Sequence, residues 1–129
     1  MSGLCLAAGL LAASLPLSSF TLAWTHSIEK IRWEEDYRIV GTRLVLEEAR
    51  ILGSGAGMEP PPDARLDRRG VWHYRPPLAP LQRLRLSHSP YAGNYEICSA
   101  GSCRPLGAIL APLPEFATVE VAACGPAAN

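Results

Sequence analysis

Apolar and polar residues alternate along several segments of the chain with a period of two, which is typical of strands with one buried face. The pattern is clearest in residues 20–26 (FTLAWTH), 31–40 (IRWEEDYRIV) and 43–51 (RLVLEEARI). In the third of these, strict alternation places Leu46 and Glu48 on the same side of the strand. We therefore predict three strands in the first half of the chain.

The rest of the chain consists of shorter apolar runs separated by turn residues. Twelve prolines and eleven glycines among 129 residues punctuate these runs, as in proteins with many turns. A chain of this length fits one domain. We predict a single all-β domain over residues 1–129, a small antiparallel sandwich or barrel of about ten short strands. The further predicted strands are residues 71–75, 81–86, 94–99, 103–106 and 118–123. Strands 94–99 and 103–106 form a predicted hairpin around Ala100 and Gly101.

Residues 4–15 form an apolar segment with two interpretations. Its length suits the hydrophobic region of an export signal, but no basic residue precedes it and the first one is Lys30. The segment is too short to cross a bilayer as a helix, so we predict no transmembrane segment. We favour a β-hairpin that turns at Ala8 and Gly9. On this basis we predict a cytoplasmic location, with the periplasm as the alternative.

The four cysteines, Cys5, Cys98, Cys103 and Cys124, show neither a C-x-x-C pair nor the spacing of a zinc motif. We predict free buried thiols, which are common in protein cores. A disulfide between Cys98 and Cys103 across a hairpin is the alternative. No cofactor is indicated.

Composition and charge exclude two broad classes. Apolar residues make up 48% of the chain and charged residues 19%, which is the composition of a globular protein and not of a disordered one. The formal net charge is zero. Because phosphate binding needs a concentrated basic face, we predict no nucleic-acid partner.

Glu35 is the most unusual charged residue in the pattern. The alternation places it on the same strand face as Trp33 and Tyr37. A carboxylate on an apolar face needs a partner, and we predict that His26 or an arginine supplies it. Such pairs are more often structural than catalytic.

No catalytic constellation emerges from the remaining motifs. Neighbouring residues on a strand point to opposite faces, so His26 is not placed to activate Ser27. The glycines of residues 53–58 (GSGAGM) lack the G-K-[ST] ending of a phosphate-binding loop. We predict no enzyme and no metal site, since only tertiary contacts would gather the conceivable ligands His26, His73, His88 and Glu35.

Three segments together resemble a bacterial family called domain of unknown function 1850. They are residues 25–30 (THSIEK), 33–37 (WEEDY) and 53–58 (GSGAGM). The family shows a His-Ser-Val segment, then Glu-x-Tyr, then a Ser-x-Gly-Ala-Gly-Met-Pro-like loop. In this chain Ile28 replaces the valine and Glu59 separates the methionine from the proline. The resemblance is densest between residues 20 and 62.

The resemblance implies an accessory role in transport, because such proteins are often encoded beside TRAP solute transporters of the TAXI type. Together with the absence of a catalytic constellation, it favours a non-enzymatic binding module whose partner is a transporter subunit or a small solute. The alternatives are a small β-barrel ligand-binding domain unrelated to transport and, less favoured, a hydrolase that uses His26 or His88 with Glu35. The candidate binding residues are those of the motifs: His26, Ser27, Glu35, Tyr37, Ser54, Gly55, Ala56, Gly57 and Met58.

Overall fold

The computed structural model describes residues 3–25, 31–52, 61–91 and 94–124. Their regular secondary structure is almost entirely strand, and every strand pair is antiparallel. The prediction of an all-β fold is therefore confirmed. The strands are β1 (Gly3–Ala8), β2 (Leu11–Leu15), β3 (Ser19–Thr25), β4 (Arg32–Val40), β5 (Arg43–Leu52), β6 (Arg65–Leu66), β7 (Val71–Tyr74), β8 (Arg83–His88), β9 (Glu96–Ser99), β10 (Ser102–Pro105) and β11 (Ala117–Cys124).

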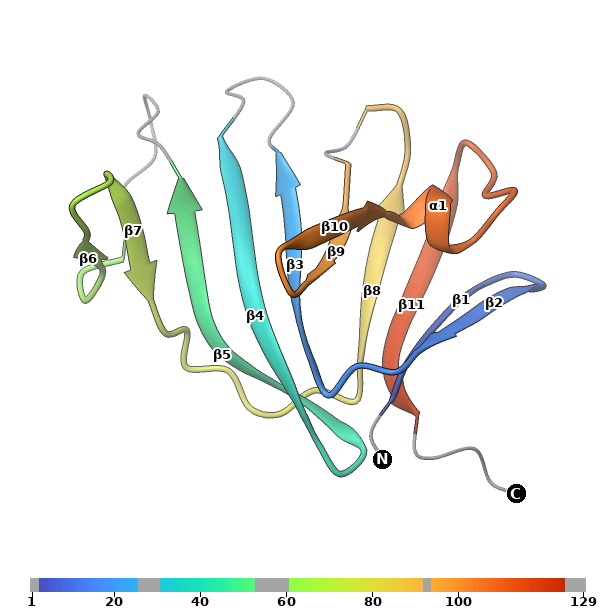
Figure 1. Ribbon diagram of the computed structural model, residues 1–129, viewed down its shortest axis with the longest axis horizontal. Helices are drawn as coiled ribbons and strands as arrows, with labels where there is room; N and C mark the ends of the chain where they lie inside the picture. Colours follow the sequence, from blue (N-terminus) through green and yellow to red (C-terminus); the bar gives the residue numbers. More distant parts are fainter. Residues whose placement is uncertain (1–2, 26–30, 53–60, 92–93, 125–129) are drawn as a thin grey trace.

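The strands form two sheets. One has four strands in the order β2-β1-β11-β8, and the other has seven in the order β10-β9-β3-β4-β5-β7-β6. Figure 1 shows the short strands β6 and β7 at one end of the molecule and the β1–β2 hairpin at the other. Within the described ranges neither sheet closes into a barrel, so the structure corresponds to the sandwich alternative. A single helical turn, α1 (Leu106–Ile109), was not predicted.

One hydrophobic core joins the two sheets. The four-stranded sheet contributes Leu4 and Leu6 from β1 and Val119 and Val121 from β11, all at most 1% exposed. The seven-stranded sheet contributes residues that alternate along β3, β4 and β5, among them Phe20, which stacks on Tyr37 with ring centroids 5.3 Å apart. Burial of these side chains is the main favourable contribution to folding.

The apolar N-terminal segment forms the predicted hairpin. β1 and β2 pair from Leu4 opposite Leu15 to Ala8 opposite Leu11. Gly9 lies in the connecting turn with a φ of 57°, a conformation that glycine adopts without a steric penalty. Separately, no helix in the described ranges has the length and apolarity required to cross a membrane.

A β-bulge between β4 and β5 changes which face the second half of β5 presents. Asp36 pairs with Glu48 and Tyr37 pairs with Leu46, so Glu47 is an extra residue on β5. The prediction that Glu48 shares a side with Leu46 is therefore wrong, because one extra residue inverts the alternation that follows it. As a result Glu48 lies on the polar face of the sheet, while Ala49 lies on the core face.

The prediction of free buried thiols is also wrong. Cys5 forms a disulfide with Cys124, which links β1 to β11, and Cys98 forms one with Cys103 across the β9–β10 hairpin. The second pair was the stated alternative, and the hairpin that carries it was predicted correctly. The first pair joins residues 119 apart in sequence, and only the pairing of the terminal strands brings them together.

Candidate functional site

Two of the nine candidate binding residues, Glu35 and Tyr37, lie in the described part of the structure. The other seven lie outside the described residues: His26, Ser27, Ser54, Gly55, Ala56, Gly57 and Met58. The strands next to them are well defined. β3 ends at Thr25 and β5 ends at Leu52, and both residues are in register with Arg32 at the start of β4. Residues that precede the two motif segments therefore lie at the same end of the seven-stranded sheet.

Glu35 lies on the core face of this sheet, three residues along β4 from Arg32. It is in register with Leu22 on β3 and Ala49 on β5. The Tyr37 hydroxyl donates a hydrogen bond to Glu35 Oε1 at 2.8 Å. We predicted that His26 or an arginine would be the partner of Glu35. Within the described ranges its hydrogen-bonding partner is instead Tyr37.

The surroundings of Glu35 disfavour its charge. Burial raises the pKa of the Glu35 carboxyl, and the hydrogen bond from Tyr37 offsets only part of the effect. Burial, reinforced by the nearby Glu35 carboxylate, raises the pKa of Tyr37, Tyr74 and Tyr95. These hydroxyls stay protonated at neutral pH and keep their capacity to donate a hydrogen bond to Glu35 or to a ligand.

Aromatic rings border Glu35 toward the same end of the sheet. Trp24 and Trp33 stack nearly parallel with centroids 6.2 Å apart, and Trp24 also contacts Tyr95 at 5.6 Å. All three rings are partly exposed. A carboxylate beside aromatic faces is suited to a ligand that carries a cation or a hydrogen-bond donor.

The opposite face of the sheet carries a network of charged side chains centred on Arg50. Its guanidinium donates two hydrogen bonds to Asp36, at 2.6 and 2.7 Å, and one each to Glu34 and Glu48, both at 3.0 Å. The Arg50 side chain is only 19% exposed. Burial raises the pKa of Asp36, but hydrogen bonds from Arg50 and Thr21 more than offset it, so the pKa is lowered.

His73 extends this network to β7. Its two ring nitrogens lie 2.8 Å from Glu48 and 2.7 Å from Asp67. Hydrogen bonds to Asp67 and then Glu48 raise the pKa of His73. His73 is in register with Arg50 and so lies on the face opposite Glu35. His73 is therefore not placed to join Glu35 in a metal site, and His26 lies outside the described residues. In the described ranges no group of three or more His, Cys, Asp or Glu side chains could hold a metal ion.

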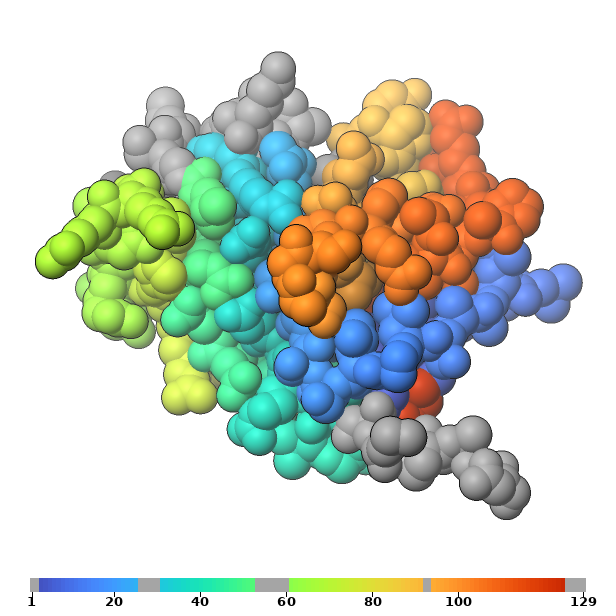
Figure 2. Space-filling view, viewed as in Figure 1, coloured from blue at the N-terminus to red at the C-terminus, as the bar shows by residue number. Residues whose placement is uncertain are grey.

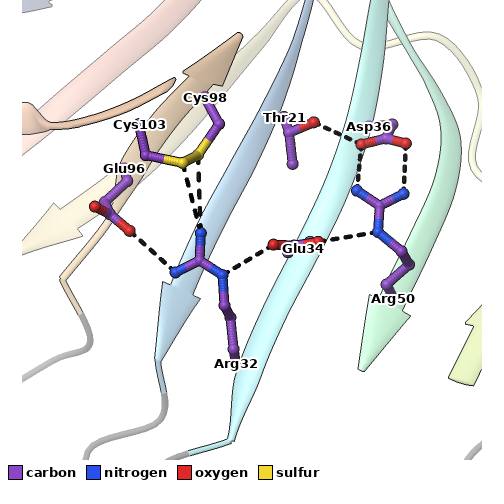
Figure 3. The surroundings of a disulfide bond; sticks show 8 residues. All are labelled: Thr21, Arg32, Glu34, Asp36, Arg50, Glu96, Cys98 and Cys103. Atoms are coloured by element: carbon purple, nitrogen blue, oxygen red, sulfur yellow. Dashed lines mark hydrogen bonds and ion pairs between the residues drawn. A yellow bond between two sulfur atoms is a disulfide. The ribbon is translucent and has the colours of Figure 1, made fainter. Parts of the chain in front are cut away.

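Arg32 links the network to the Cys98–Cys103 disulfide (Figure 3). Its Nε donates to Glu34 at 2.9 Å and its Nη1 donates to Glu96 at 3.1 Å. The remaining nitrogen, Nη2, lies 3.8 Å from the Cys98 sulfur and 3.7 Å from the Cys103 sulfur. We did not predict a role for Arg32. The available signal was its alternation with Glu34 and Asp36, but the disulfide beside it comes from a distant part of the chain.

A polar hollow of about 330 Å³ adjoins the disulfide. Strands β3, β4 and β5 form its floor, and the β9–β10 turn forms a wall that includes Cys98. The hollow gives a polar ligand or a peptide access to this face of the sheet. Its lining includes Thr21, Asp36, Arg50, Cys98, Ser99 and Ala100.

These features define an all-β, disulfide-linked domain of two antiparallel sheets, with a charged network on the open face of the larger sheet. The chain belongs to the family described as Domain of unknown function (DUF1850), whose model matches residues 20–106. No curated protein and no solved structure matches the chain. β1, β2 and β11 lie outside the matched range, although they supply three of the four strands of the smaller sheet.

Proposed function

We propose that this protein is a non-enzymatic accessory module of a TAXI-type TRAP solute transport system, and that it binds a transporter subunit or a small solute. The observation that carries the proposal is where the described residues of, and next to, the family motifs lie. Thr25 is the first residue of one motif and Leu52 immediately precedes another, and both share a row with Arg32. The third motif contains Glu35 and Tyr37 on the same strand as Arg32. The described residues of, or next to, three motifs far apart in sequence therefore lie on neighbouring strands of one sheet.

The chemistry at this end of the sheet supports binding. Glu35 and the tyrosine hydroxyls offer polar contacts within an aromatic setting, which is how small-ligand sites combine affinity with orientation. The link to TRAP transport rests on the family resemblance.

The two disulfides support a periplasmic location over the cytoplasmic one that we predicted. Disulfides persist in oxidising compartments such as the periplasm and are rare in the cytosol. A periplasmic module would meet the solute-binding and membrane subunits of a transporter on the side where solute is captured.

The proposal is tested by deleting the gene in its bacterial host and measuring TAXI-dependent uptake of labelled solute. We expect uptake to fall and to recover when the wild-type gene is returned. Glu35→Gln should restore uptake only in part, because it removes the carboxylate from the motif face. Glu47→Gln, which removes an exposed carboxylate from the next strand, should restore it fully. Unchanged uptake in the deletion strain would refute the transport role.

A ligand-binding domain unrelated to transport is the second candidate. The observation that favours it is that Glu35 has no cationic hydrogen-bonding partner within the described ranges, although it borders Trp24 and Trp33. Tetramethylammonium chloride should then raise the melting temperature of the wild type more than sodium chloride does. Equal effects of the two salts on the wild type and on Glu35→Gln would exclude an organic cation as the ligand.

A further inference from the structure

The Cys98–Cys103 disulfide lies on an edge hairpin of the seven-stranded sheet. β10 is the edge strand and, in the described part of the chain, pairs only with β9. Cys103 is exposed, whereas Cys98 is only 9% exposed. In Figure 2 the orange segment that contains β10 lies at the molecular surface. An incoming group therefore reaches the Cys103 sulfur more readily than the Cys98 sulfur.

Arg32 is held so that one guanidinium nitrogen faces both sulfurs. Glu34 and Glu96 take up its other two donating nitrogens, which fixes the orientation of the group (Figure 3). A neutral disulfide sulfur is a weak hydrogen-bond acceptor, whereas a thiolate accepts a strong, charge-assisted hydrogen bond. Arg32 therefore stabilises a thiolate at this position much more than it stabilises the disulfide.

Within the described ranges, Arg32 is the cation that donates toward both sulfurs. Glu34 is shared with Arg50, whose guanidinium compensates its charge. Glu96 opposes a thiolate, but it is also one of the two groups that hold Arg32 in place. Cys5 and Cys124 provide an internal comparison. In the described ranges no hydrogen-bond donor faces their sulfurs, and they join β1 and β11, the two inner strands of their sheet.

We propose that Cys98–Cys103 is a thiol-exchange site and that Cys5–Cys124 is a purely structural disulfide. The substrate is a thiol, either a small molecule or a cysteine of another protein. Its thiolate attacks the Cys103 sulfur and forms a mixed disulfide, while the Cys98–Cys103 bond breaks and its electron pair goes to Cys98. Arg32 stabilises the Cys98 thiolate that leaves.

A second thiolate completes the reaction. It attacks the sulfur of the first substrate thiol in the mixed disulfide, and Cys103 leaves as a thiolate. Two substrate thiols are thereby oxidised to one disulfide, and the Cys98–Cys103 disulfide is reduced to two thiols. Arg32 acts as a positioning residue for the leaving group.

The first test uses the full chain without substitutions. The oxidised protein is incubated with reduced glutathione, quenched by alkylation at successive times, and mapped by mass spectrometry. We expect a glutathione adduct on Cys103 and opening of Cys98–Cys103 at least about tenfold faster than opening of Cys5–Cys124. Equal opening rates, or an adduct confined to Cys5 or Cys124, would overturn the proposal.

The second test isolates the guanidinium. In the reduced protein, Arg32→Met should slow iodoacetamide alkylation of Cys98 at pH 7 about tenfold or more and move its pH profile upward, because an adjacent cation lowers a thiol pKa. Arg38→Met is the matched control, an exposed arginine on the same strand that pairs with Glu47. Arg32→Lys keeps a cation and should recover part of the rate. Identical profiles for the Met variants would overturn the role of Arg32.

The source of the thiol is distinguished by a parallel reaction with a reduced dithiol protein of the thioredoxin class. Fast exchange with glutathione indicates a small-thiol substrate. Fast exchange with the dithiol protein, when glutathione gives the Cys103 adduct only slowly, indicates a protein substrate. Failure of both to open Cys98–Cys103 faster than Cys5–Cys124 would refute thiol exchange altogether.

Discussion

The two disulfides should differ strongly in what they contribute to stability. Cys5 and Cys124 are 119 residues apart, so their bond closes nearly the whole chain into a loop, whereas Cys98 and Cys103 are 5 residues apart. In the chain-entropy model a disulfide stabilises by restricting the unfolded chain, and the effect grows with loop length. The model gives about 5 kcal/mol for the long loop and about 2 kcal/mol for the short one.

The perturbation is a pair of double variants, Cys5→Ala with Cys124→Ala and Cys98→Ala with Cys103→Ala. Each variant removes two sulfur atoms. Cys5 and Cys124 are partly exposed, Cys98 is buried and Cys103 is exposed, so any extra loss of packing falls on the short-loop variant and works against the expected order. We expect the free energy of unfolding to fall by about 3 kcal/mol more in the first variant than in the second. At m-values of 1–3 kcal/mol/M, that difference separates the urea midpoints by about 1–3 M.

The assay is urea unfolding followed by far-ultraviolet circular dichroism, with the fully reduced wild type as a reference. In the reduced wild type, the free energy of unfolding should fall by about the sum of the two disulfide contributions. Equal midpoints for the two double variants would refute the entropic reasoning, and so would a lower midpoint for the short-loop variant. Either result would mean that packing of β1 against β11, not the cross-link, fixes the terminal strands.

Three further predictions concern single residues, each measured by urea unfolding. Ala100→Gly should stabilise the protein by about 1 kcal/mol, because Ala100 has a φ of 53° in the β9–β10 turn, and an unchanged or lower midpoint would contradict this. Glu35→Gln should raise the midpoint at neutral pH, because burial raises the pKa of Glu35 and its ionised form destabilises the folded state. That gain should vanish as the pH falls toward the ordinary glutamate pKa of about 4.3, and a gain that does not change with pH would contradict the reasoning. The wild type should be more stable than His73→Gln, as measured by the free energy of unfolding. This difference should be largest below about pH 6.5 and should disappear as the pH rises through the raised pKa of His73. A difference that is independent of pH would refute an ion pair with Asp67.

The faces of β3 and β4 could be predicted because they depend on local alternation alone. Alternation over residues 20–26 and 31–40 places Phe20 and Tyr37 on the apolar face of their strands, and the structure pairs them across that face. Glu35 was singled out on the same basis, and its burial follows from the pattern. Its partner could not be predicted, because the Tyr37 hydroxyl reaches it along the strand and competes with groups from elsewhere in the chain.

The second half of β5 shows where this reasoning stops. Nothing in residues 43–51 marks Glu47 as the extra residue of a bulge, because a bulge is a property of two paired strands and not of one. Without that bulge Glu48 and Arg50 would both face the core, and Arg50 would not pair with Glu34 and Asp36 on the polar face. The charged face of the sheet is therefore a consequence of register.

The sequence by itself determined the all-β class, most strands, both hairpins and the unusual position of Glu35, since a period of two and a turn residue are local properties. The tertiary structure alone decided which cysteines meet, which face the second half of β5 presents, and that Arg32 lies against a disulfide from residues 98 and 103. The physical reason is that these contacts join distant segments, and their geometry is set by strand order and register, which no single segment encodes.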